Sequence, residues 1–166
     1  MSFVIRLARP EDAESIRAIY NEAVHTTTAT FDTEERDLAT QQSWLARHSG
    51  DPYSCFVAED RDGMLAGWAS LSSYNPKPGY RGTAENSVYV DPRSQRHGIG
   101  EALLQALLDD APTHGIRTLI ALVSADNIAS LRLHEKLGFR TVGTLERVGR
   151  KFDRDIDVAI LQKHVG

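Results

Sequence analysis

The chain has 166 residues, 41% hydrophobic and 25% charged, so we expect one folded domain over residues 1–166 and exclude a disordered or fibrous protein. Its 19 lysines and arginines are outnumbered by 23 acidic residues, and the net charge of −4 offers no global basic field for nucleic acid. The longest apolar runs, such as residues 119–123, are too short to span a membrane, and no signal peptide is apparent. With the lone Cys55, which excludes an internal disulfide, this predicts a cytoplasmic protein with no membrane partner.

Hydrophobic periodicity predicts four helices and seven strands. Apolar residues recur at three- and four-residue spacing in the helices, whereas the strands are short apolar or alternating runs bounded by turn residues. In chain order we expect strand 4–8, helix 11–25, a second helix ending near residue 50, strands 54–59, 64–74 and 83–90, helix 99–111, strand 118–124, helix 128–137, and strands 141–148 and 156–162. This order predicts a mixed α/β fold in which helices cover a partly antiparallel sheet.

The clearest chemical signal is a basic turn at residues 91–100, Asp-Pro-Arg-Ser-Gln-Arg-His-Gly-Ile-Gly, between a strand and a helix. A helix N-terminus presents unpaired N–H groups and the positive end of the helix dipole, so it binds phosphate readily. Glycines let an anion approach closely, and Arg93 and Arg96 could add charge-assisted hydrogen bonds. A dinucleotide fingerprint is excluded because Leu103 stands where a third glycine is needed, and no Walker A lysine is present. An ordinary turn with solvated arginines remains the alternative.

Two motifs together resemble a known superfamily. Residues 95–100, Gln-Arg-His-Gly-Ile-Gly, match the Arg/Gln-x-x-Gly-x-Gly/Ala signature of the GNAT N-acetyltransferases, and they follow a Val-Tyr-Val strand as in that family. A second signature, from residues 127–130 through 135–139, lies at the expected distance downstream. The resemblance covers nearly the whole chain. It implies a GNAT fold, a mostly antiparallel twisted sheet of about seven strands flanked by about four helices.

Within that superfamily the chain resembles the phosphinothricin and methionine sulfoximine N-acetyltransferase branch, in residues 28–31, 80–81, 83–90, 133–139 and 148–152. The resemblance implies acetyl-CoA as acetyl donor, no metal, a small amine acceptor and a homodimer. Backbone groups of Val88 and Val90 would hold the pantetheine arm, and the turn over residues 96–101 its pyrophosphate. The expected acetyl-CoA residues are Val88, Tyr89, Val90, Arg93, Arg96, His97, Gly98, Ile99, Gly100, Glu101, Asn127 and Ser130.

Acetyl transfer requires a neutral amine, and a lysine-like amine with a pKa near 10.4 is neutral only about once in a thousand at pH 7. We expect Glu85 to be the general base, through a water, because the resemblance assigns it that role. An outward-facing strand carboxylate is the alternative. His134 stands where many GNAT enzymes carry a tyrosine that protonates the departing thiolate. It is either an acid or relay in catalysis or a partly buried structural histidine.

For the acceptor, we expect Arg81 to hold a substrate carboxylate, with Phe31, Asn75, Lys77, Tyr80 and Glu85 lining the pocket. Two departures from the branch leave the acceptor open: Asn75 stands where relatives often carry a basic or aromatic residue, and residues 153–155, Asp-Arg-Asp, replace the usual Gly-Arg-Trp. The alternatives are a GNAT enzyme for another amine (a peptide N-terminus, lysine or polyamine) and a non-catalytic acyl-CoA sensor.

Overall fold

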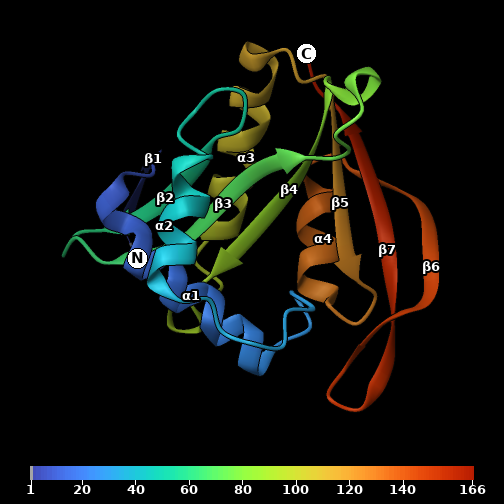
Figure 1. Cartoon of the computed structure of the whole chain (residues 1–166), viewed down its shortest axis with the longest axis horizontal. Coiled ribbons are helices and arrows are strands. Elements are labelled where there is room, and N and C mark those ends of the chain that lie inside the picture. Colours follow the sequence, from blue (N-terminus) through green and yellow to red (C-terminus); the bar gives the residue numbers. More distant parts are fainter. Residues whose placement is uncertain (1) are drawn as a thin grey trace.

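The computed structural model describes residues 2–166 as a twisted sheet with helices on both faces (Figure 1). The elements in chain order are β1 (Phe3–Leu7), α1 (Ala13–Thr26), α2 (Leu38–Ala46), β2 (Cys55–Asp60), β3 (Leu65–Ser73), β4 (Thr83–Val90), α3 (Ile99–Asp110), β5 (Thr118–Ser124), α4 (Ile128–Lys136), β6 (Arg140–Lys151) and β7 (Arg154–His164). The strand order is β1-β2-β3-β4-β5-β7-β6, and every neighbouring pair is antiparallel except β4 and β5. The predicted mixed α/β class with seven strands and four helices is confirmed.

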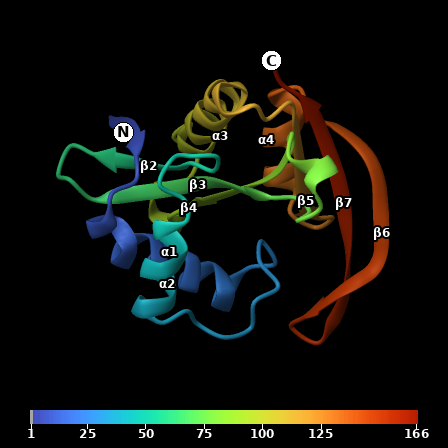
Figure 2. The same ribbon diagram turned by 45° about the horizontal axis from the view of Figure 1, so that its top comes forward.

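The helices divide the core into two layers. Figure 2 shows α1 and α2 on one face of the sheet and α3 with α4 on the other. Beneath α3, Leu103, Leu104 and Leu107 are fully buried in one cluster, because their three- and four-residue spacing turns them all towards the sheet. Beneath α1, Ile16 and Trp68 belong to a second cluster on the opposite face. No helix among residues 2–166 combines the length and hydropathy that crossing a membrane requires.

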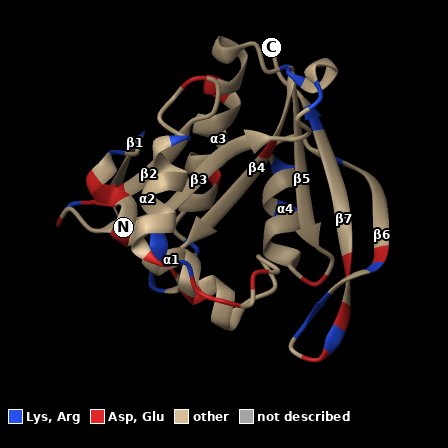
Figure 3. Cartoon of the chain, viewed as in Figure 1, with Lys and Arg blue, Asp and Glu red and all other residues tan. Residues whose placement is uncertain are grey.

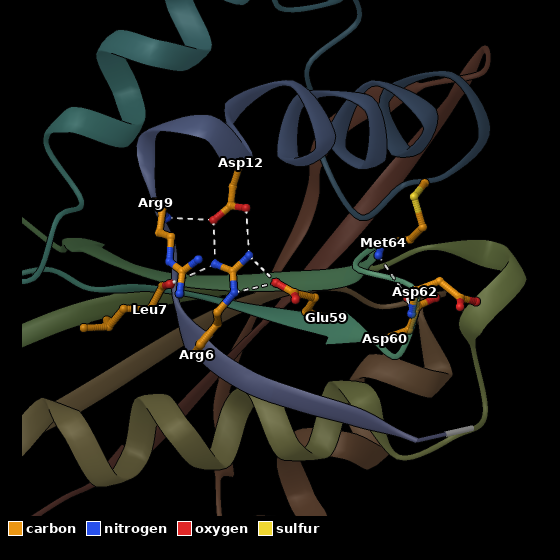
Figure 4. Close-up of polar contacts among 8 residues, drawn as sticks. All are labelled: Arg6, Leu7, Arg9, Asp12, Glu59, Asp60, Asp62 and Met64. Atoms are coloured by element: carbon orange, nitrogen blue, oxygen red, sulfur yellow. Dashed lines mark hydrogen bonds and ion pairs between the residues drawn. The ribbon is translucent and has the colours of Figure 1, made fainter.

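A partly buried ion-pair network fixes the start of α1 to the edge of the sheet (Figure 4). The Arg6 guanidinium in β1 binds the Asp12 carboxylate at 2.7 Å and, from Nε, the Glu59 carboxylate at 2.6 Å. Asp12 also accepts a hydrogen bond from the backbone N–H of Arg9 at 2.7 Å. Residues 10–12 form a 3-10 turn in this network, so α1 begins at Ala13 and the predicted start at residue 11 was two residues too early.

The final hairpin is longer than the sequence indicated. The predicted strands 141–148 and 156–162 are residues 140–151 and 154–164 in the structure. The register of β6 shifts between Leu145 and Gly149, and Arg147 inside this bulge has a φ of 53°. Pairing resumes beyond the bulge and ends at a two-residue turn, Phe152 and Asp153, both with positive φ. Gly149 and the charged residues around it indicated the end of a strand, because β-bulges and turns use similar residues.

Strands β4 and β5 run side by side only at their beginnings. They pair in parallel over three residues, Thr83 to Glu85 with Thr118 to Ile120, and then diverge (Figure 1). Beyond this point β4 remains paired with β3 as far as Val90, and β5 remains paired with β7 as far as Ser124. Each strand therefore keeps one edge unpaired where the two separate. This opening positions the site described next.

Candidate active site

A cavity of about 1080 Å³ lies where β4 and β5 separate. It is lined by β4, β5, the end of α1 and the loop after it, the turn before α3, the first part of α4, and the β6–β7 hairpin. That volume lies at the upper end of the range for small-molecule sites, so the cavity can hold a ligand with a long arm. The unpaired edge of β4 forms one wall, and backbone N–H and C=O groups on such an edge can bind an extended chain as an added strand.

The cavity reaches both faces of the sheet, since side chains of β4 alternate between them. Val88 and Val90 pack against the cluster beneath α3, whereas Tyr89 packs against the cluster beneath α1. By the same alternation, Asn86 faces α4 and Glu85 faces the α1 side. We call these two halves the α3 side and the α1 side of the cavity.

On the α3 side, the N-terminus of α3 meets the cavity at Arg96 and Gly100. Gly98 is the N-cap with a φ of 79°, a left-handed conformation that favours glycine, and its carbonyl accepts the first intrahelical bond, from the Ala102 N–H at 3.0 Å. The N–H groups before Ala102 have no partner within the helix and remain available to an anion. A Cβ on Gly100 would lie 3.3 Å from a methyl group of Leu133, so a larger residue here would press on α4.

The α4 end of the same side is held by a capping residue. Asn127 is the N-cap of α4, and its Oδ1 accepts a hydrogen bond from the Ser130 N–H at 3.2 Å. Both residues line the cavity. Asn127 therefore has a structural function of its own, whatever it contacts in a ligand.

Glu85 lies at the point where β4 leaves β5. Its side chain is half-buried, lines the cavity, and makes no hydrogen bond or ion pair with any residue from 2 to 166. Burial raises the pKa of the carboxyl above its ordinary value, and no cation nearby opposes the shift. A half-buried carboxylate with no partner is poorly suited to a structural role and well suited to accepting a proton.

His134, in α4, is 3% exposed and uses both ring nitrogens within the protein. Nδ1 lies 2.8 Å from the Ser130 carbonyl oxygen, and Nε2 lies 2.9 Å from Nδ2 of Asn86. Burial lowers the pKa of the imidazole, although the Ser130 bond partly opposes this. The Oδ1 of Asn86 is buried and has no hydrogen-bond partner. Sequence reasoning missed Asn86, whose one signal was a carboxamide on an otherwise apolar strand face.

On the α1 side, the loop after α1 is tied to distant parts of the chain. The Lys151 ammonium donates to the carbonyl oxygens of Thr27 at 2.7 Å and Thr30 at 2.8 Å, and its side chain is buried. Thr28 donates to Asp126 at 2.8 Å, and the hydroxyl of Ser124 donates to the Thr28 carbonyl at 2.5 Å. Burial lowers the pKa of Lys151, with the charge of Asp32 opposing the shift. None of these anchoring contacts was expected from the sequence.

Comparison with known proteins now identifies this architecture. The acetyltransferase (GNAT) domain family matches residues 5–160. The chain is 40% identical over 162 residues to the L-methionine sulfoximine/L-methionine sulfone acetyltransferase of Pseudomonas aeruginosa, covering 98% of this chain and 94% of the relative. The chain belongs to the GNAT acetyltransferase family.

Two further comparisons support the same assignment. The chain is 39% identical over 157 residues to the phosphinothricin N-acetyltransferase of Streptomyces coelicolor, covering 93% of this chain and 92% of the relative. The crystal structure of a phosphinothricin acetyltransferase from Sinorhizobium meliloti in complex with AcCoA superposes with a TM-score of 0.96 at 32% identity, covering 100% of this chain and 90% of that one. This GNAT protein is therefore an N-acetyltransferase with acetyl-CoA as its acetyl donor.

The cavity of the GNAT protein brings together only part of the residues expected at its site. Those that line it are Phe31, Glu85, Val88, Tyr89, Val90, Arg96, Gly100, Asn127, Ser130 and His134. His97 and Gly98 lie beside the lining, and Ile99 points into the core. Arg93 is 85% exposed at its side chain and is held by the Asp91 carboxylate at 2.7 Å. Glu101 pairs with Lys136 at 2.6 Å.

The loop before β4 lies outside the cavity lining. It carries the predicted acceptor residues Asn75, Lys77, Tyr80 and Arg81. Asn75 accepts a hydrogen bond from the Lys77 N–H at 3.0 Å, and Tyr80 packs edge-on against Tyr74 with ring centroids 5.6 Å apart. Arg81 is exposed, and its guanidinium makes no hydrogen bond or ion pair with the described residues. Within residues 2–166, no three His, Cys, Asp or Glu side chains gather as metal ligands.

Two charged residues of the cavity were not expected from the sequence, Asp126 after β5 and Arg154 at the start of β7. They form an ion pair with each other. The tip of the β6–β7 hairpin carries further charges of both signs (Figure 3). Among these, Arg147 and Arg150 both pair with Asp155. Asp155, which stands where the branch usually has a tryptophan, therefore adds ion pairs to the hairpin beside the cavity.

Proposed function

We propose that this GNAT enzyme acetylates the α-amino group of a small amino acid of the methionine sulfoximine or phosphinothricin kind, with Glu85 as general base. The observation that carries the proposal is the half-buried, unpartnered Glu85 carboxylate at the point where β4 and β5 diverge. The names of the relatives support the acceptor class. An α-amino group needs only modest help to lose its proton, since its pKa is closer to 8 than that of a lysine.

Different residues of the chain remove the proton and bind the acetyl donor. Acetyl-CoA supplies an acetyl thioester, whose C–S bond breaks as the new C–N bond forms. The sulfur leaves as the CoA thiolate and takes up a proton from water, and the nitrogen of the new amide releases its second proton to water. Glu85 receives the proton of the attacking amine through one water, so the nitrogen lone pair becomes available. The free N–H groups at the start of α3 and the Arg96 guanidinium bind the pyrophosphate of the donor. Backbone groups of Val88 and Val90 on the unpaired edge of β4 hold its pantetheine arm.

For the acceptor's carboxylate we propose Arg81. Its guanidinium has no partner among the described residues, and the loop that carries it leads directly into β4, four residues before Glu85. Arg154 lines the cavity, but its charge is already paired with Asp126. An unpaired arginine offers all of its donors to a bidentate contact. Phe31, Tyr80, Asn75 and Lys77 would then surround the acceptor's side chain.

The test is CoA thiol release from acetyl-CoA with methionine sulfoximine, phosphinothricin, a lysine peptide and spermidine. We expect release with the first two, a loss in kcat of roughly 10²- to 10⁴-fold in Glu85→Gln, and unchanged acetyl-CoA affinity by calorimetry. Glu11→Gln, an exposed carboxylate in the N-terminal turn, is the matched control. An unaltered kcat in Glu85→Gln would contradict the base assignment.

The same panel separates the alternatives. Release with the lysine peptide or spermidine alone would mean that the acceptor is another kind of amine. Acetylation of a polyamine would not depend on Arg81. Tight acetyl-CoA binding without release on any amine would favour an acyl-CoA sensor.

We also propose a cytoplasmic homodimer built from one catalytic domain. Strands β5 and β6 and the β6–β7 turn expose several large apolar side chains, namely Leu122, Val142, Leu145, Val148 and Phe152, all but Val142 also lining the cavity. A second copy of the chain could cover them. Cys55 is a buried free thiol, which suits a reducing compartment. Analytical ultracentrifugation measures the mass directly, and a monomer at micromolar concentration would contradict the dimer.

A further inference from the structure

We propose that His134 is a positioning residue that stays neutral and holds the Asn86 carboxamide, and that it does not deliver the proton to the departing sulfur. The inference deepens the proposed function and rests on it for the kinetic part of its test. It depends on the hydrogen-bond pattern of three neighbouring groups, Ser130, His134 and Asn86.

The pattern determines which ring nitrogen carries the proton. A carbonyl oxygen can only accept, so the 2.8 Å contact with the Ser130 oxygen requires a proton on Nδ1 of His134. In the neutral ring Nε2 then carries only a lone pair, so it must accept a hydrogen bond from the Nδ2 of Asn86 at 2.9 Å. A proton on Nε2 would point at the two hydrogens of that amide. Protonation of the ring therefore requires the amide of Asn86 to turn over.

No charged group contacts the ring, and only the Ser130 carbonyl favours its charged form, against the effect of burial. The groups that contact the imidazole are Ser130 on α4, Asn86 on β4 and the ring of Phe139 ahead of β6, with centroids 5.0 Å apart. None of them carries a charge. Glu85 is the neighbour of Asn86 in the chain, but alternation along β4 sends its side chain to the other face. A histidine that serves as an acid usually has a carboxylate partner, and no described carboxylate bonds to this one.

The bond instead anchors the strand that carries the base. The Oδ1 of Asn86 has no partner in the described chain, so the bond from Nδ2 to His134 alone orients the carboxamide. Asn86 directly follows Glu85, at the residue where β4 loses its pairing with β5. His134 thus links α4 to β4 at the point where sheet hydrogen bonds on one side have ended. The position of the Glu85 carboxylate depends on this link.

Three variants test the role. In His134→Gln the side-chain amide replaces the Nε2 acceptor but cannot act as an acid, whereas His134→Ala removes the acceptor altogether. We expect His134→Ala to lower kcat at least tenfold with little change in acetyl-CoA affinity, and His134→Gln to restore most of the loss. Asn86→Leu should match His134→Ala, and combining the two should cost little more. A Gln variant as inactive as the Ala variant, with the alkaline limb of the pH–kcat profile lost, would overturn the inference.

A measurement without turnover keeps the inference independent of the proposed function. Nitrogen-15 NMR of the histidine rings should show His134 as the neutral Nδ1–H form from pH 6 to 8. In Asn86→Asp a carboxylate would face Nε2, so the pKa of His134 should rise and the ring should gain a second proton. A His134 that titrates in the wild type within that range would contradict the assignment. If no amine is acetylated by the wild type but the ring remains neutral, the proposed function fails and the hydrogen-bond assignment stands.

Discussion

The two sides of the cavity are built in different ways. On the α3 side, the groups that face a ligand come mainly from two contiguous segments, the turn before α3 and the start of α4, and many are backbone N–H groups. On the α1 side, the loop after α1 is held by side chains from β4, β5, β6 and the segment before α4. Lys151 and the Thr27 carbonyl that it binds are 124 residues apart in sequence.

From this difference we propose that the α3 side binds the acetyl donor and that the α1 side selects the acceptor. A helix N-terminus presents its donors because of helix geometry, so it tolerates changes elsewhere in the chain. The α1 side depends on contacts between segments that are far apart, and a change in any one of them alters the shape of the acceptor region. We therefore expect acetyl-CoA binding and acceptor binding to respond to different substitutions.

The largest change in substrate KM should follow from removing the buried ammonium on the α1 side. Lys151→Met leaves the carbonyls of Thr27 and Thr30 unpaired, and each charge-assisted bond of this kind contributes about 1.5–3 kcal/mol. We expect the acceptor KM to rise roughly 10- to 100-fold and the melting temperature to fall, while acetyl-CoA affinity stays within about threefold. Steady-state kinetics with each substrate varied in turn measures this.

The control is Lys163→Met in β7, a lysine whose ammonium makes no hydrogen bond with the described residues and which does not line the cavity. It should leave both KM values unchanged. Equal losses for acceptor and acetyl-CoA in Lys151→Met would show that the two sides are not independent.

A smaller effect, confined to the donor, should follow on the α3 side. Arg96→Gln removes the one cation that lines this part of the cavity in the described chain, and we expect the acetyl-CoA KM to rise about tenfold with kcat nearly constant. The rise should shrink at high salt, because added ions screen exposed charges. Arg93→Gln is the matched comparison, since its guanidinium is already held by Asp91. A larger effect at Arg93 than at Arg96 would reverse the assignment of the two arginines.

The smallest expected effect concerns stability at the boundary between the two sides. Burial raises the pKa of Glu85 in the folded protein above its unfolded value, so the folded state binds this proton more tightly. The contribution of the protonated Glu85 carboxyl to the free energy of unfolding is then full below the unfolded pKa and is lost as the pH rises through the folded pKa.

Glu85→Gln should therefore melt at a higher temperature than the wild type at pH 8, and at the same temperature as the wild type below about pH 4. The activity of the wild type should rise with pH over the same range in which its stability falls, since only the ionised Glu85 carboxylate accepts a proton. Thermal melts across this range measure it, and a difference in melting temperature that does not vary with pH would exclude Glu85 as its source.

Much of the fold could be predicted because its signals are local. The leucines of α3 repeat at helical spacing, and Gly98 with Gly100 marks the turn ahead of it. The end of β6 was misjudged because a bulge around Arg147 uses residues that also terminate strands. Among the candidate site residues, the basic turn was singled out for the same local reason, whereas the residues of β4 were assigned by resemblance. The acceptor loop at residues 75–81 was assigned by resemblance, and it lies outside the cavity lining.

By itself, the sequence determined the family, the order of the elements and the basic turn at the start of α3, because helix spacing, turn residues and a contiguous motif are properties of neighbouring residues. Only the tertiary structure decided that Lys151 holds the loop after α1, that Glu85 has no partner, and that Asn86 and His134 share a hydrogen bond. Burial and pairing depend on which distant segments meet, and a side chain acquires its pKa and its partners from them.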